Sequence, residues 1–191
     1  MAWNQSDELI VAGTGEVYVA AVGTSLPANE STALSSSLWT GLGYHTEDGV
    51  SISNTPETQR YNAWQSKRPV RLDRGVETFT LTFNLEQFNE ATFPLAFGGG
   101  DVTEPTSGHY KYEPPTDTDG LDERAVICDV VDGANIIRFV IPRGVATEAV
   151  ETSFTRTALA TLPITIEALE PADGGSAWYA LSNLAGFEVG S

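Results

Sequence analysis

Two histidines, one cysteine and one acidic segment are the residues of this 191-residue chain with the clearest capacity for chemistry. His45 and His109 have no second histidine or cysteine at metal-ligand spacing, whereas zinc sites combine three or four such ligands. Cys128 lies in the apolar run AVICDVV, which is typical of a buried and unreactive thiol. The segment Asp117 to Glu123 resembles a calcium loop, but proline and valine stand where an EF-hand needs two carboxylates. We therefore expect no metal ion and no cofactor.

Catalytic motifs are also missing from the sequence, and we expect a protein that is not an enzyme. No G-x-S-x-G nucleophile elbow occurs, so acyl transfer has no support. A small hydrolase with two carboxylates about 5 to 9.5 Å apart stays open, because 26 acids permit such a pair by chance. A monomeric β-sandwich that binds carbohydrates or receptors is the other alternative, with Trp39 and Trp64 as platforms for sugar rings. Assembly into filaments would count against both.

The charge is unevenly distributed along this acidic chain, whose formal net charge is −16. Half of its ten basic residues fall within residues 60–74, whereas Asp101 to Asp132 holds nine acids and two bases. A solvated acidic loop and scattered surface arginines would explain this simply. Complementary patches at opposite ends of one subunit would instead generate head-to-tail assembly into rings or filaments. The acidic balance also disfavours stable binding to nucleic acid.

Strand patterns dominate the sequence. In VETFTLTFNL, Phe79, Leu81, Phe83 and Leu85 alternate with polar residues, which is typical of a half-buried antiparallel strand. We expect further strands over residues 16–22, 39–46 and 162–168, and three more between residues 125 and 154 with turns at 132–135 and 142–144. The last of these three strands would place Glu148 and Glu151 on opposite faces.

One segment, FNEATFPLAFGGG, predicts a short helix that begins near Thr92, with Asn89 or Thr92 as its cap and the glycines as its end. Residues 23–37 and 98–120 have the composition of surface loops. The expected fold is a single domain over residues 1–191, mainly antiparallel β, a sandwich or partly open barrel with one short flanking helix. With no signal peptide and no apolar run of about 20 residues, we expect a soluble protein made in a cytoplasm.

Five segments in order resemble the major tail proteins, or tail tube proteins, of long-tailed, non-contractile bacteriophages, especially those of actinobacterial hosts. They are VAGTGEVYVAAVGTSLPA, WTGLGYHTEDGVSIS, AWQSKRPVR, FTLTFNLEQFNEATFPLAFGGG and AWYALSNLAGF, and together they span nearly the whole chain. The resemblance implies a tail tube fold in which six copies form a ring, and rings stack head to tail into the virion tail. Some members carry an extra immunoglobulin-like domain, which we do not expect in these 191 residues.

The resemblance also implies partners and contact surfaces. The tube would assemble in the bacterial host cytoplasm around a tape-measure protein, join terminator and baseplate proteins, and conduct DNA without binding it or a membrane. We expect an N-terminal arm at residues 1–15, and a projecting hairpin or loop at residues 51–74 that contacts neighbouring subunits. The interface candidates are Arg60, Trp64, Lys67, Arg68, Arg71 and Arg74. The channel candidates are the polar face of the best strand, Thr78, Thr80, Thr82 and Asn84, because each strand of a tube turns one face to the lumen.

Overall fold

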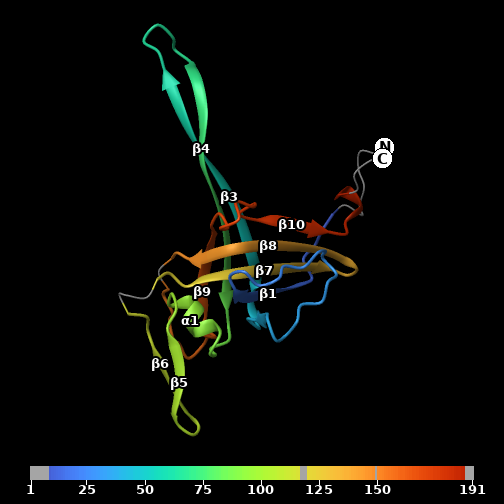
Figure 1. Ribbon diagram of the computed structural model, residues 1–191, viewed down its shortest axis with the longest axis vertical. Helices are drawn as coiled ribbons and strands as arrows, with labels where there is room; N and C mark the ends of the chain where they lie inside the picture. Colours follow the sequence, from blue (N-terminus) through green and yellow to red (C-terminus); the bar gives the residue numbers. More distant parts are fainter. Residues whose placement is uncertain (1–8, 117–119, 149, 188–191) are drawn as a thin grey trace.

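The computed structural model describes residues 9–116, 120–148 and 150–187 (Figure 1). Antiparallel strands make up most of these residues, with one short helix and a final 3-10 turn. In chain order the elements are β1 (Thr14–Ala21), β2 (Thr40–Gly41), β3 (His45–Asn62), β4 (Pro69–Leu85), α1 (Thr92–Ala96), β5 (Asp101–Thr106), β6 (His109–Glu113), β7 (Glu123–Asp132), β8 (Asn135–Ala146), β9 (Leu162–Ala168), β10 (Tyr179–Ser182) and η2 (Ala185–Phe187).

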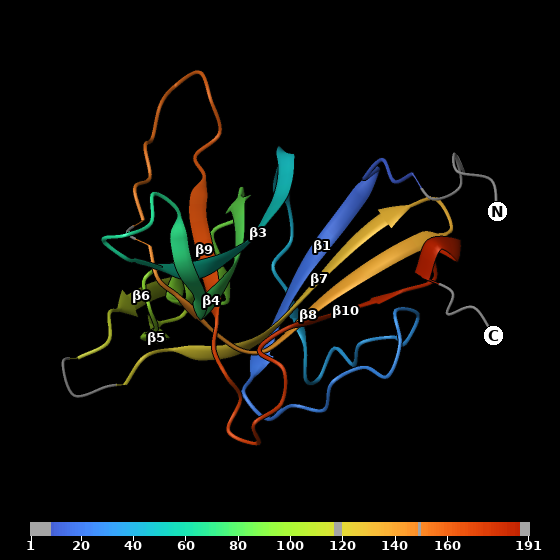
Figure 2. The same ribbon diagram turned by 90° about the horizontal axis from the view of Figure 1, so that it is seen from above.

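The main sheet has the strand order β2-β1-β7-β8-β9-β4-β3, and β10 also pairs with β8. Strand β8 pairs with β10 through residues 137–140 and with β9 through residues 144–146, so it carries the sheet from one layer into the next. Figure 2 shows β1, β7, β8 and β10 on one side and β9, β4 and β3 on the other. The described residues therefore form the expected antiparallel β-sandwich with one short helix, and their sheet does not close into a barrel.

The core lies between these two layers. The alternation predicted for β4 is confirmed, because Phe79, Leu81, Phe83 and Leu85 are all buried. They meet buried residues of β1, β7, β8 and β9, and burial of each such side chain contributes about 1.5–3 kcal/mol. Cys128 belongs to this core, and burial raises the pKa of its thiol to about 12.

One predicted turn is wrong, because residues 142–144 lie inside β8. Arg124 pairs with Gly144 and Val126 with Ile141, so β8 has one extra residue opposite β7, which is a β-bulge. A Cβ on Gly144 would lie 2.7 Å from a methyl carbon of Ile166, so glycine is needed where β8 approaches β9. Proline and glycine mark bulges as well as turns, and here they bend a continuous strand.

Two predicted strands are also wrong. The strand expected over residues 39–46 is interrupted, since β2 ends at Gly41 and β3 begins at His45. Gly43 between them has φ of 82°, a left-handed conformation that breaks the strand. The strand expected after residue 146 is absent among the described residues up to Leu162, so Glu148 lies in a bend and Glu151 in a loop.

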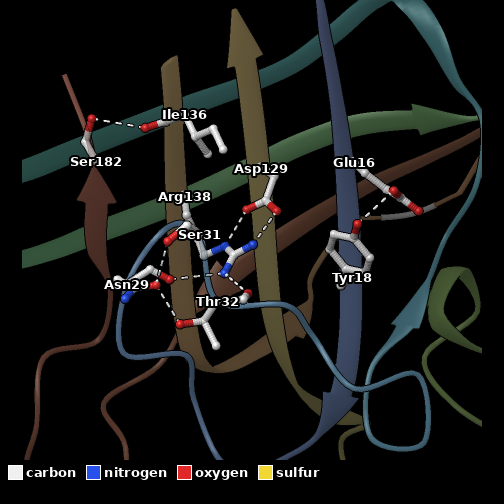
Figure 3. A network of polar contacts seen from close by, with 9 residues as sticks. All are labelled: Glu16, Tyr18, Asn29, Ser31, Thr32, Asp129, Ile136, Arg138 and Ser182. Carbon is white, nitrogen blue, oxygen red and sulfur yellow. Dashed lines mark hydrogen bonds and ion pairs between the residues drawn. The ribbon is translucent and has the colours of Figure 1, made fainter. Parts of the chain in front are cut away.

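Segment 22–39 covers the outer face of the first layer. Trp39 packs there against Ala20, Ile127 and Val140. A buried ion pair fixes the segment, as Figure 3 shows: Arg138 donates two hydrogen bonds of 2.7 Å to the carboxylate of Asp129. The same guanidinium donates to the backbone carbonyls of Thr32 (2.8 Å) and Asn29 (3.2 Å), which belong to this segment. The region that sequence composition marks as a loop is therefore anchored to β8.

Helix α1 begins at Thr92, as predicted. Asn89 supplies the cap, because its side-chain oxygen accepts hydrogen bonds from the backbone N–H groups of Ala91 (2.9 Å) and Thr92 (3.0 Å). The predicted end is also confirmed, since Gly98 has φ of 78° and the Gly99 N–H donates to the Pro94 carbonyl. Within the described part of the chain, no helix is long and apolar enough to cross a membrane.

Candidate subunit interfaces

The hairpin of β3 and β4 extends well beyond the sandwich. Strand β9 pairs with β4 only from Thr80 to Leu85, whereas β3 and β4 continue to pair with each other as far as Asn62 and Pro69. We call residues 54–78 the outer hairpin, and Figure 1 shows it pointing away from the rest of the molecule. A two-stranded hairpin is marginally stable alone in water, and its unpaired edges are templates for further pairing. The outer hairpin is therefore a surface suited to a partner.

All six interface candidates lie on the outer hairpin, and four of its five bases fall between Thr58 and Leu72, where there is no acid. Two bases already have partners: Arg71 lies 2.7 Å from Asp73 and Arg74 lies 2.9 Å from Glu77. Among the described residues, Arg60, Lys67 and Arg68 form no ion pair. Their pairing with acids of another subunit stays a prediction.

The bases outside the outer hairpin are used differently. Four of these five form ion pairs within the subunit, and only Arg156 has no such pair among the described residues. The four pairs are Lys111–Glu113, Arg124–Asp122, Arg138–Asp129 and Arg143–Glu123. Most bases outside the outer hairpin are therefore paired with acids of the same subunit, whereas the bases of the outer hairpin are exposed to solvent.

Exposed apolar side chains accompany these bases, and sequence reasoning missed most of them. Trp64 at the turn is 99% exposed, and Tyr61, Val70, Leu72 and Val76 are exposed along the strands. The signal was present in PVRLDRGV, where apolar residues alternate with charged ones as in a strand whose one face awaits a partner. Val70 and Leu72 share one face of β4, and exposed apolar side chains that share a face mark contact sites.

The four channel candidates are half-buried on the side of β4 opposite the core. Ser51, Ser53 and Thr55 of β3 pair with Thr82, Thr80 and Thr78, and Thr165 of β9 pairs with Thr82 on the other side. These seven residues form what we call the hydroxyl face. Sequence reasoning identified only its β4 part, although SISNT in β3 shows the same alternation. That this face lines a channel stays a prediction.

One end of the hydroxyl face is partly covered. The hydroxyl oxygens of Thr82 and Thr165 are 3.0 Å apart, and Thr165 donates to the carboxylate of Glu148 at 2.9 Å. Thr165 is consequently buried, whereas Ser51, Ser53 and Thr55 are exposed. The open part of this face therefore extends from β4 across β3.

The residues considered for other chemistry lie apart. Trp39 is only 5% exposed and is buried between segment 22–39 and the outer face of the first layer, so it offers no platform for a sugar. His45 packs edge-on against Phe83, and burial lowers its pKa, whereas His109 lies exposed on β6. In the described ranges, no three His, Cys, Asp or Glu residues are grouped as metal ligands. Residues 117–119 of the calcium-like segment and residues 1–8 of the expected N-terminal arm lie outside the described residues.

Comparison with known proteins agrees with the resemblance seen in the sequence. A family model described as phage tail tube protein matches residues 1–187. No curated protein matches the chain significantly. A model that covers nearly all of the sequence leaves little of the chain unaccounted for, and the antiparallel sandwich is consistent with it. The chain therefore belongs to the phage tail tube protein family.

Proposed function

We propose that this chain polymerises as stacked hexameric rings into the tail tube of a long-tailed, non-contractile phage with an actinobacterial host. Family membership makes the chain a structural protein of the virion tail that self-assembles into a tube, and it favours a role that is not enzymatic. The outer hairpin is the observation that carries the proposed ring and its stacking, and the hydroxyl face supports the proposed channel for the passage of DNA to the host.

The outer hairpin supports the proposal because its structure is poorly suited to an isolated subunit. It has no third strand, it exposes Trp64 and Leu72, and Arg60, Lys67 and Arg68 have no acid to pair with in the described residues. Each exposed ion pair contributes only about 0.2–1 kcal/mol, so several must act together with apolar burial. In a stacked tube every subunit would supply such a contact to its neighbour, and the contact would repeat without closing.

The hydroxyl face and the overall charge support the channel. The outer hairpin has five bases and three acids, which leaves five bases and 23 acids, a charge of −18, for the rest of the chain. The hydroxyl face carries no lysine or arginine, so it would hydrate well and offer no attraction to passing phosphates. DNA would then move past it with little friction and without stable binding.

The remaining partners belong to the same proposal. The tube would assemble in the bacterial host cytoplasm around a tape-measure protein, and its ends would meet terminator and baseplate proteins. The surfaces for these contacts would be the two ends of the ring stack, because a head-to-tail interface leaves one unsatisfied copy at each end.

Negative-stain electron microscopy of the purified full-length protein across a concentration series tests the proposal. We expect six-fold rings or tubes at high concentration, and matching tubes in virions that contain this chain. A protein that stays monomeric at every concentration and is absent from virion tails would contradict the proposal and favour the monomeric binding module instead.

A further inference from the structure

An aromatic pocket lies between α1 and the β5–β6 hairpin. Phe88, Phe93, Tyr110 and Tyr112 line it, and its volume is about 600 Å³. The ring centroids of Phe93 and Tyr112 are 5.1 Å apart in an edge-on arrangement, and Phe88 lies 6.3 Å from Phe93. Tyr110 is 73% exposed at the edge of the pocket. Phe93 therefore packs against both Phe88 and Tyr112, whereas Tyr110 lies exposed at the edge of the pocket.

The walls of the pocket are held in place by hydrogen bonds. The Tyr112 hydroxyl donates to the Gly99 carbonyl at 2.8 Å, which ties β6 to the end of α1. The side chain of Asn89 caps the start of α1, and Phe93 follows directly in the first turn. A pocket with fixed aromatic walls offers a preformed site for an apolar group, so little binding free energy is lost in ordering the pocket.

The segment that forms the pocket is acidic. Residues 86–113 contain five acids and one base, Lys111, whose ammonium group lies 2.7 Å from the Glu113 carboxylate. Glu90 lines the pocket itself. The segment therefore has a net charge of −4. The four bases between Thr58 and Leu72 on the outer hairpin give a charge of equal magnitude and opposite sign. A group that enters this pocket is favoured if positive charge accompanies it.

The outer hairpin and the pocket lie at opposite ends of the molecule. In Figure 1 the turn of the outer hairpin is at one end of the long axis, whereas α1, β5 and β6 lie toward the other end. A contact between these two surfaces cannot form within one subunit, but it forms naturally between successive copies in a head-to-tail stack.

We infer that the aromatic pocket receives Trp64 from the next copy of this chain. This inference rests on the proposed self-assembly and names its receiving site. Trp64 is almost fully exposed, and an indole ring buries a large area when it packs against phenyl rings in edge-on or offset contacts. Lys67 and Arg68 follow it in the same turn, so they would reach Glu90 and the exposed face of Tyr110 as the indole enters.

Cross-linking between introduced cysteines tests the contact directly. The native Cys128 is 1% exposed and its thiol has a raised pKa, so a short bismaleimide reagent will not react with it. The variant W64C/Y110C should give a ladder of covalent multimers in assembled tubes, whereas each single variant should give none beyond a dimer. The matched control is W64C/Y44C, because Tyr44 is also 73% exposed but lies outside the pocket.

Removal of the two rings gives a second, independent measurement. Trp64→Ala should raise the critical concentration for assembly at least about 30-fold, which is typical of a hot-spot tryptophan. Tyr110→Ala should weaken assembly in the same direction, and the double variant should be no worse than Trp64→Ala, since both remove one contact. Tyr44→Ala should have no effect.

The outcomes separate this inference from the proposed function. If tubes form normally but W64C/Y110C gives no ladder, the docking site is overturned and the tail tube role stays intact. A ladder from the control W64C/Y44C has the same consequence. Additive effects of Trp64→Ala and Tyr110→Ala would also overturn it, because the two side chains would then act in separate contacts. A wild-type protein that forms no tubes would count against the proposed function itself.

Discussion

Reversal of two charges at the tip of the outer hairpin is the sharpest test of its role. Lys67 and Arg68 are the residues to change, because neither forms an ion pair among the described residues, whereas Arg71 is already bound to Asp73. Lys67→Glu with Arg68→Glu changes the charge of residues 58–72 from +4 to zero. Both positions are exposed and lie outside the strands, so the free energy of unfolding should change by less than about 0.5 kcal/mol.

The effect on assembly follows from the size of exposed ion pairs. Each reversal removes an attraction and adds a repulsion of similar size, so the two changes affect four terms of about 0.2–1 kcal/mol each. The total, about 0.8–4 kcal/mol per contact, corresponds to an increase in critical concentration of between about fourfold and about 900-fold. Salt should reduce this difference, because the Debye length falls from about 10 Å at 0.1 M to about 3 Å at 1 M.

Pelleting of tubes at graded protein and salt concentrations measures the effect, and circular dichroism melting verifies that the variant folds. Lys67→Arg combined with Arg68→Lys is the matched control, because it changes the same two exposed positions and keeps both positive charges. If the charge-reversed variant pellets at the wild-type concentration, or if the charge-preserving variant is equally impaired, the tip charge has no specific role and the reasoning is refuted.

Three further outcomes are expected. Arg138→Ala should destabilise the subunit by about 3–5 kcal/mol in urea unfolding, because it leaves the largely buried carboxylate of Asp129 without its partner. Asp129→Leu combined with Arg138→Met should recover part of this loss. Thr80→Lys should permit assembly but slow DNA ejection, most strongly at low salt, whereas Thr103→Lys on β5 should leave the ejection rate unchanged. Ejection of DNA at the wild-type rate by the Thr80→Lys variant would remove Thr80 from the channel. The hydrogen bond from Arg143 lowers the pKa of Glu123 from 4.5. The ionised Glu123 carboxylate therefore stabilises the folded state above the unfolded-state pKa of 4.5, and this contribution is lost as pH falls through the folded-state pKa. Glu123→Gln should flatten this part of the acid unfolding curve.

Local sequence patterns predicted those parts of the fold that depend on neighbouring residues. The alternation of Phe79 to Leu85 specified a half-buried strand, because side chains of a strand point to opposite faces in turn. Asn89 and Gly98 marked the ends of α1, because capping and left-handed φ are requirements of single positions. In each case the physical cause lies within a few residues of the signal.

The features that sequence missed depend on distant residues. Residues 142–144 look like a turn, yet β7 and β9 lie on either side and hold them in a bulged strand. Arg138 gave no signal, because its carbonyl partners lie more than 100 residues away. The aromatic pocket was missed for the same reason, since Phe93 and Tyr112 are brought together only by the packing of α1 against β6. Trp64 was identified, but its receiving site was not.

The distribution of charge reconciles two opposite demands on a subunit of this kind. Bodies that each carry −18 repel one another, which keeps free subunits apart and soluble. The unpaired bases at the tip of the outer hairpin overcome this repulsion only where they contact acids while the hairpin also contacts an apolar site. Single exposed ion pairs are too weak to do so. Salt weakens the long-range repulsion between bodies more than it weakens a docked, partly buried contact. We therefore expect moderate salt to favour assembly of the wild type, and high salt to abolish only the advantage that Lys67 and Arg68 give it. Light scattering of the wild type and the charge-reversed variant across a salt series distinguishes this view from simple screening, under which the wild type would lose assembly steadily from the lowest salt upward.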